Sequence, residues 1–258
     1  MILASHGIIA SQIASFDADA VAFFNRVTTA GGSLSATEKQ AVNQLVLDLK
    51  ANSLWTPMKA VYPMVGASAA ACAQNLKSSS FTGTFTSGWT FASTGVTGNG
   101  TSAYMDTNFN PNTSSNANSK HMSYYSRNNF NNCQIGVLAT IFDQIYYVAG
   151  AYYNILSTSS FNPINTATTK GFQIISRISS VGGTTTYVNN SNLGNDGITA
   201  TGNPNGNLWL NARATSASGT ASANECAFAS IGDGLTDTQA ANFYTCVNTF
   251  QTTLSRNV

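Results

Sequence analysis

The sequence predicts a mainly β protein: a β-sandwich of the jelly-roll kind, with a helical hairpin before it and a single helix after it. Three observations support this prediction. Residues 81–91, FTGTFTSGWTF, alternate aromatic and hydroxyl side chains, and a strand would place the aromatics on one face and the threonines on the other. From about residue 81 to 231, short apolar segments are separated by Gly and Asn. Outside that region, apolar residues recur at helical spacing.

The first part of the chain, 1–65, is predicted to hold an arm and the helical hairpin. Residues 1–15 are mildly apolar and fit either an arm that docks on another surface or a flexible tail. A helix is predicted over 16–30, because Asp17 and Asp19 fall in its first turn, where the helix dipole favours acids. Gly31 and Gly32 end it.

The second helix, predicted over 35–52, has the clearest pattern. Ser35 and Glu38 match the capping box S-x-x-E, and an apolar stripe with i, i+3, i+4, i+7 spacing begins at Val42. Two helices joined by a short glycine loop suggest a hairpin whose apolar faces need a partner. Residues 54–63 are interpreted as a connector packed on that hairpin.

The second part, 66–258, is predicted to be the sandwich with its terminal helix. Residues 66–80 are small and polar and lead into the sheets. Gly182 and Gly183 separate two alternating segments and predict a β-hairpin. Thr236 and Gln239 give a second capping-box match before an apolar-striped helix over 237–254, which is expected to pack on the hairpin or the sheet. The further predicted strands are 102–109, 121–127, 134–141, 145–148, 172–178, 184–188, 208–213 and 226–231, with 112–119 and 189–206 as loops.

Composition fits a folded β protein with an uncharged surface. The 258 residues allow one large β domain or two small ones, and the 43% of hydrophobic residues suffice for a core. Charged residues make up only 8%, and Ser, Thr, Asn and Gly take their place, which is common in β-rich extracellular and viral surface proteins. Disorder is the competing interpretation, and the interleaved aromatic and aliphatic residues argue against it.

Charge and hydropathy exclude two classes of partner. The formal net charge is +1 and the 11 Lys and Arg are scattered, so we expect no nucleic-acid partner. The first residues lack the basic start of a signal peptide, and His6 interrupts the apolar run, so we expect synthesis in a cytoplasm without an export signal. No run reaches the ~18 apolar residues of a membrane span, so we expect no membrane insertion.

The four cysteines lack the spacing of a metal site. None forms a C-x-x-C pair. Buried thiols are the simpler interpretation, and a disulfide framework in a secreted protein is the alternative. The cysteines are Cys72, Cys133, Cys226 and Cys246.

No residue is assigned a catalytic, cofactor-binding or metal-binding role, and the chain is predicted not to be an enzyme. His6 and His121 are the only imidazoles and have no nucleophile motif beside them. A glycosidase needs two carboxylates across a sugar site, and sequence alone cannot bring two together. Asp233 and Asp237 flank a glycine turn, where Ca²⁺ binding competes with the simpler role of turn and helix-start residues. The acids outside the predicted helices are Asp106, Asp143, Asp196, Glu225 and Asp233.

Adjacent tyrosines are the remaining candidates for function. If each pair lies in a strand, one ring of the pair faces outward. Tyrosine rings stack on sugars and anchor protein interfaces, although a sandwich whose tyrosines merely reach water with their hydroxyls has the same pattern. The pairs are Tyr124 with Tyr125, Tyr146 with Tyr147, and Tyr152 with Tyr153.

Most of the chain, from about residue 16 to 256, resembles a group of viral proteins. The residues that carry the resemblance are FDADAVAFF, LVLDLKANSLW, MKAVYPMVG, GWTFASTGVTGNGTSAYMDTNFNP, HMSYYSR and FASIGDGLTDTQAANFYTCVNTFQTTLSR. This order resembles uncharacterised proteins of tailed bacteriophages, many infecting Bacteroidetes. Their middle portion looks like a concanavalin-like or LamG-like jelly roll. LamG-like domains sometimes hold Ca²⁺ at a sheet edge, and no paired acidic motif here supports that.

The resemblance implies a structural component of a bacteriophage virion, such as a fibre, a spike or a capsid decoration protein. It implies localisation in the virion, contact with other virion proteins, a homo-oligomer (a trimer above all) and host attachment, with a host-surface glycan as a further partner. It supplies no cofactor and no site residues. A carbohydrate-binding adhesion module is the alternative function, and a polysaccharide-cleaving enzyme is the third.

Overall fold

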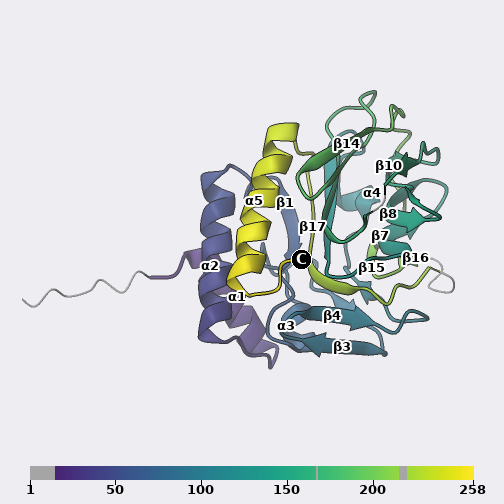
Figure 1. The fold of residues 1–258 in the computed structure, drawn as a ribbon. Coiled ribbons are helices and arrows are strands. Elements are labelled where there is room, and N and C mark those ends of the chain that lie inside the picture. Colours follow the sequence, from purple (N-terminus) through teal and green to yellow (C-terminus); the bar gives the residue numbers. More distant parts are fainter. Residues whose placement is uncertain (1–14, 167, 215–219) are drawn as a thin grey trace, which may run out of the picture.

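The molecule has three layers. The computed structural model describes residues 15–166, 168–214 and 220–258. Helices form one outer layer, an eight-stranded sheet forms the middle layer, and a nine-stranded sheet forms the other outer layer (Figure 1). The predicted β-sandwich with an N-terminal helical hairpin and a C-terminal helix is therefore confirmed.

The helical layer consists of three helices. Both predicted capping boxes are present: Ser35 with Glu38, and Thr236 with Gln239. Lys50 of the second helix joins the first helix through ion pairs to Asp17, at 2.7 Å, and to Asp19, at 2.6 Å. The three helices are α1 (Ala18–Thr29), α2 (Ala36–Ala51) and α5 (Asp237–Thr253), and two single turns lie elsewhere, α3 (Ala69–Cys72) and α4 (Pro111–Ser114).

The middle sheet is antiparallel and covered on both faces. Its centre is the pairing of β6 with β12 on one side and with β17 on the other. β12 and β13 form the hairpin predicted from the two glycines, and Gly183 adopts the positive φ of 69° that the turn needs. In order, its strands are β14 (Ser191–Asn195), β13 (Thr185–Val188), β12 (Gly171–Arg177), β6 (Lys120–Ser126), β17 (Glu225–Gly232), β4 (Gly95–Gly98) and β3 (Trp89–Ala92), with β1 (Met58–Tyr62) also paired to β17.

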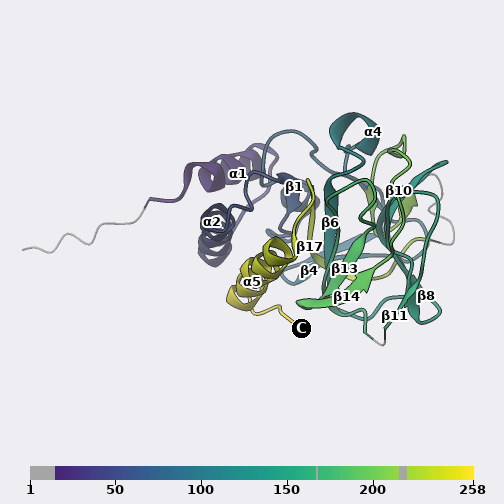
Figure 2. The same ribbon diagram turned by 90° about the horizontal axis from the view of Figure 1, so that it is seen from above.

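The outer sheet lies on the side away from the helices, where β8 and β11 are found opposite α1 and α2 in Figure 2. Its pairs are antiparallel except that of β16 with β7. In order, its strands are β11 (Ile164–Asn165), β9 (Ala151–Tyr152), β8 (Phe142–Val148), β7 (Asn132–Leu138), β15 (Trp209–Leu210), β5 (Met105–Asp106) and β2 (Thr84–Phe85), while β10 (Ile155–Thr158) pairs with β8 and β16 (Arg213–Ala214) with β7.

Two hydrophobic cores separate the layers. One lies between the helices and the middle sheet and includes Tyr125, Phe228 and Phe243. The other lies between the two sheets and includes Tyr124, Ile135 and Ile145. Alternate residues of β6 thus enter different cores, as strand geometry requires. Among the described helices, none is both long enough and apolar enough to cross a membrane.

Several local predictions are wrong. The loop predicted over 189–206 contains strand β14, the strand predicted over 208–213 is interrupted between β15 and β16, and the strand predicted over 102–109 is reduced to β5. Residues 81–91 do not form one strand: β2 belongs to the outer sheet and β3 to the middle sheet, and the chain turns between them at Gly88, whose φ is +91°. Their aromatics still gather, because Phe85 lies 5.1 Å from Trp89 between ring centroids. The connector predicted over 54–63 contains strand β1, which pairs with β17. That strand lies inside the 1–65 segment, and the division of the chain at residue 65 stays a prediction.

Candidate functional site

A small groove on the outer face of the nine-stranded sheet is the candidate site. Ile145 of β8 points into the core between the sheets, so alternation along the strand turns Gln144 and Tyr146 to the opposite face. The groove encloses about 260 Å³. It is lined by Phe142, Gln144, Tyr146 and Val148 of β8, by Tyr153, Ile155 and Phe161 of the following segment, and by Arg213 of β16.

Three aromatic rings form one wall of this groove. The ring centroids of Tyr146 and Tyr153 are 6.3 Å apart with planes inclined by 53°. Tyr153 in turn meets Phe161 edge to face at 5.1 Å. Phe161 is 48% exposed, although large apolar side chains are normally covered. The groove therefore offers an apolar, aromatic surface to a ligand arriving from solvent.

Two polar side chains complete the groove. The amide of Gln144 is buried; its Nε2 donates to the carbonyl of Tyr153 at 3.0 Å, and its Oε1 accepts from Nη1 of Arg213 at 3.2 Å. The Arg213 guanidinium carbon lies 5.4 Å from the centroid of the Tyr146 ring. Gln144 thus fixes one edge of the guanidinium group against an aromatic ring.

Strand pairing explains how residues distant in sequence meet here. Gly136 of β7 pairs with Gln144 on one side and with Arg213 on the other. A Cβ atom at Gly136 would lie 3.0 Å from the Cβ of Gln144 and 3.0 Å from the Sγ of Cys133, so a glycine is favoured at the centre of this row. The turn before Arg213 is set by Asn211, whose φ is +59°, a conformation that asparagine tolerates better than most residues.

The predicted tyrosine pairs behave in two ways. Tyr146 and Tyr153 face the groove, whereas Tyr147 and Tyr152 pack against each other at 5.2 Å on the inner side. For these two pairs the predicted outward ring is confirmed.

The first pair contradicts the prediction, because Tyr124 and Tyr125 are 0% and 2% exposed. Both faces of β6 are covered, one by the outer sheet and the other by the helices. The sequence carried no signal for Gln144, Phe161 or Arg213, which join the site only through long-range pairing.

The histidines do not form a site in the part of the chain that the structure describes. His6 lies outside the described residues. His121 is fully buried beneath α5; its Nδ1 lies 2.6 Å from the carbonyl of Asp233, and its Nε2 lies 3.1 Å from Oγ of Ser230. Burial lowers its pKa to about 4, so it is a neutral packing residue near neutral pH.

The acidic candidates have structural partners and are spread over the molecule. Asp143 pairs with Lys120 at 2.7 Å between the sheets, and burial raises the pKa of its carboxyl while Lys120 opposes that shift. Asp196 accepts from the backbone of Thr184 at 2.7 Å, Asp106 from that of Asn108 at 2.8 Å, and Glu225 pairs with Arg127 at 2.9 Å.

The suggested Ca²⁺ ligands are engaged as well. Asp233 pairs with Lys59 at 2.8 Å, and Asp237 accepts from the hydroxyl of Tyr187 at 2.5 Å. Within the described ranges, no three His, Cys, Asp or Glu side chains gather closely enough to hold a metal ion. The four cysteines are buried free thiols, as the simpler interpretation held. Burial raises the pKa of Cys72, Cys133 and Cys226 to about 12.

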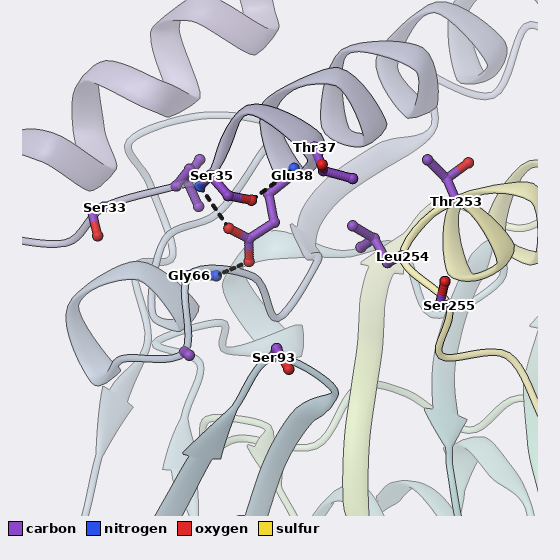
Figure 3. A pocket seen from close by; sticks show the side chains of 11 residues that line it. Ser33, Ser35, Thr37, Glu38, Gly66, Ser93, Thr253, Leu254 and Ser255 are labelled. Atoms are coloured by element: carbon purple, nitrogen blue, oxygen red, sulfur yellow. Dashed lines mark hydrogen bonds between the residues drawn. The ribbon is translucent and has the colours of Figure 1, made fainter.

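A larger hollow, of about 640 Å³, lies between the start of α2 and the end of α5 (Figure 3). Hydroxyl groups line much of it, and its one carboxylate is Glu38. That carboxylate accepts from the backbone N–H of Ser35 at 2.8 Å and of Gly66 at 2.7 Å, as the dashed lines in Figure 3 show. Because Glu38 already connects α2 to the loop at Gly66, we interpret this hollow as a gap in the packing of these elements and not as a ligand site.

Comparison with known proteins finds solved structures of similar fold, but it finds no family to which the chain can be assigned. No protein-family model matches the chain, and no curated protein matches it. Domain 4 of AbnA, a GH43 extracellular arabinanase from Geobacillus stearothermophilus solved in complex with arabinotriose, has a TM-score of 0.55 at 12% identity and covers 72% of this chain and 98% of that domain. The sialidase of Trypanosoma rangeli, in complex with sialic acid, has a TM-score of 0.52 at 8% identity over 80% of this chain. The chain matches only 38% of that sialidase. Both likenesses concern the fold alone.

Proposed function

We propose that this protein is a non-catalytic carbohydrate-binding adhesion module whose groove on the outer sheet holds a sugar. The observation that carries the proposal is the meeting of three aromatic rings with a buried amide and a guanidinium group in one groove. Sugar rings present apolar C–H faces and polar hydroxyl edges, so aromatic stacking and planar hydrogen-bonding groups together suit them.

The size of the groove supports a short ligand. Its 260 Å³ falls just below the roughly 300–1,000 Å³ of typical small-molecule pockets. A single sugar ring, such as the end of a chain or one side branch, fits such a space better than an extended polysaccharide does. The arabinanase domain of similar fold was solved with a saccharide bound, which is a second support for the same class of ligand.

Binding without cleavage is proposed because of the groove's side chains. In most glycosidase families, hydrolysis of a glycosidic bond uses two carboxyl groups that are about 5–10 Å apart on either side of the bond. Among the described residues that line the groove, none is acidic. The nearest acid in sequence, Asp143, points to the opposite face of β8 and is paired with Lys120.

A glycan array followed by titration calorimetry tests this function. We expect binding of at least one glycan, and we expect Tyr153→Ala and Tyr146→Ala each to weaken it about tenfold, since loss of one stacked ring costs on the order of 1 kcal/mol or more. Phe16→Ala is the matched control, because Phe16 is 40% exposed next to the helical layer, far from the groove. A blank array, or equal loss in all three variants, would reject the proposal.

A virion location is the second proposal, and it is compatible with the first. Its support is the sequence resemblance to tailed-phage proteins, in particular the segments NGTSAYMDT and GDGLTDTQA. The strands β8 and β16, which carry groove residues, lie on the side of the molecule away from the helical layer (Figure 1), so attachment through the helices would leave the groove open to a host glycan. We propose a homo-oligomeric, exposed virion component. Mass spectrometry of purified particles should find the protein in stoichiometric amounts, and its absence would exclude this location.

A further inference from the structure

We infer that the groove selects an acidic saccharide, whose carboxylate is bound by the guanidinium group of Arg213. This inference rests on the proposed sugar-binding function and adds the chemical class of the ligand. It starts from the hydrogen bonding of the five arginines in the sequence.

Four arginines have strong or numerous acceptors within the protein. Arg177 donates to the carbonyls of Leu156 and Ile198, among others, and Arg256 donates to Gln251 and to three backbone carbonyls. Arg26 donates to two backbone carbonyls, and Arg127 pairs with a carboxylate. These side chains are structural, since their donors are used to fasten loops and strands together.

Arg213 differs from the other four. Within the described residues its acceptor is a single neutral group, the amide oxygen of Gln144, at 3.2 Å, and its Nε, like that of Arg26, is buried without a hydrogen-bond partner. A guanidinium group carries five N–H donors and a full positive charge. Among the described residues, Arg213 therefore has N–H donors without an acceptor and a positive charge without an ion-pair partner, at the wall of the groove.

The surroundings leave that charge without compensation by a nearby acid. No described acidic side chain lines the groove or pairs with Arg213. The aromatic rings lower the local polarity, and an ionic hydrogen bond is stronger in a poorly solvated site than in water. An anion placed there would complete the hydrogen bonding of the guanidinium group.

The geometry favours a planar carboxylate on a sugar. Gln144 is buried and holds one edge of the guanidinium group, and the Tyr146 ring lies alongside it. The plane of the guanidinium group is thus fixed, as two-point binding of a carboxylate requires. A sugar carboxylate at Arg213 would leave the sugar ring next to Tyr146 and Tyr153. Uronic acids and sialic acids share this combination of a ring and a carboxylate.

Calorimetry with charge-matched ligands tests the inference. The probes are trigalacturonate, triglucuronate, trimannuronate and 3′-sialyllactose, each compared with its own methyl ester, which keeps the shape and removes the charge. We expect at least one acid to bind ten times or more tightly than its ester, with a preference that falls as NaCl is raised. We expect Arg213→Gln to abolish this preference while binding of the ester persists.

Two further variants separate a direct role from a structural one. Arg213→Lys keeps the charge without the planar fork, and we expect it to recover part of the preference. Lys170→Gln removes an equal charge at an exposed position and should change nothing. Urea unfolding of each variant shows whether the fold is kept.

Three results would overturn parts of the interpretation. If acids and esters bind equally, or if Arg213→Gln weakens both alike, the acidic class is wrong while sugar binding stands. If neutral glycans bind on an array and none of these acids does, the inference likewise fails. If neither acidic nor neutral glycans bind, the proposed function itself is rejected.

Discussion

The hydroxyl of Tyr124 donates a hydrogen bond of 2.6 Å to Oδ1 of Asn211, 87 residues further along the chain. Tyr124 lies in β6 of the middle sheet, Asn211 lies in the turn between β15 and β16 of the outer sheet, and both are completely buried. The amide of Asn211 also donates to the carbonyl of Asn224, at 2.8 Å. Because Arg213 follows Asn211 by two residues, this bond between the sheets helps to fix the strand that supplies the cation of the groove.

Replacement of Tyr124 by Phe should destabilise the protein by about 1–3 kcal/mol, because a buried carbonyl oxygen would lose its donor. Urea denaturation measures the change. Tyr147→Phe is the matched control: its hydroxyl reaches the carbonyl of half-buried Thr166 at 3.0 Å, where water can take its place, so we expect a smaller loss. Equal losses in the two variants would contradict the role given to the bond between the sheets.

The buried ion pair of Lys120 with Asp143 gives a second prediction. Lys120→Met should cost about 3–5 kcal/mol, since it leaves a buried carboxylate without its cation. The double variant Lys120→Met with Asp143→Leu should recover much of that loss, because no uncompensated charge remains. Chemical denaturation of both variants checks the order of stability. A double variant less stable than Lys120→Met would contradict this prediction and would show that loss of Asp143, which also accepts from the backbone N–H of Ser157 at 2.7 Å, costs more than its unpaired charge does.

The pH dependence of stability gives a third prediction. Burial lowers the pKa of His121 to about 4 from an ordinary value of 6.5, so between these pH values the unfolded chain binds more protons than the folded one. The free energy of unfolding should therefore fall as pH drops from about 6.5 to 4, by about 3 kcal/mol in total from this residue. Ser230, Phe243 and the carbonyl of Asp233 surround the ring, and Lys59 adds a nearby positive charge.

Denaturation of the native protein and of His121→Gln at a series of pH values measures that contribution by difference. Asp143 has a raised pKa and acts in the opposite direction, but it is present in both proteins and cancels in the difference. A variant with the same slope as the native protein between pH 4 and 6.5 would show that His121 does not titrate as described.

Local signals in the sequence predicted the helices and most strands. The capping boxes at Ser35 and Thr236 mark helix starts through contacts within four residues, and such contacts leave a readable pattern. The alternation around the glycine turn at Gly183 likewise predicted the hairpin of β12 and β13. These features depend on neighbours in sequence and hardly at all on the rest of the fold.

The groove could not be predicted in the same way. The guanidinium group of Arg213 and the amide of Gln144 meet because Gly136 pairs with both residues. No local sequence pattern near any of the three predicts that strand register. The outward ring of each tyrosine pair was predictable only where one face of the sheet is open. On β6 the helical layer covers the second face, so Tyr125 is buried although its spacing matches that of the exposed rings.

The two capping boxes allow a comparison within one molecule. Glu38 and Gln239 occupy the same helical position, and each side chain accepts from the backbone N–H of its N-cap, at 2.8 Å in α2 and 3.0 Å in α5. Glu38 alone accepts a second hydrogen bond, from the N–H of Gly66 at 2.7 Å (Figure 3).

Glu38→Ala should therefore cost more stability than Gln239→Ala, by about 1 kcal/mol, the net value of one further hydrogen bond. Glu38→Gln should fall between the native protein and Glu38→Ala, since the amide keeps a single acceptor oxygen for two donors. Thermal and urea unfolding of the three variants give the comparison. If Glu38→Ala and Gln239→Ala were equally destabilised, the link between α2 and the loop at Gly66 would contribute nothing, and the hollow beside it would be open to another interpretation.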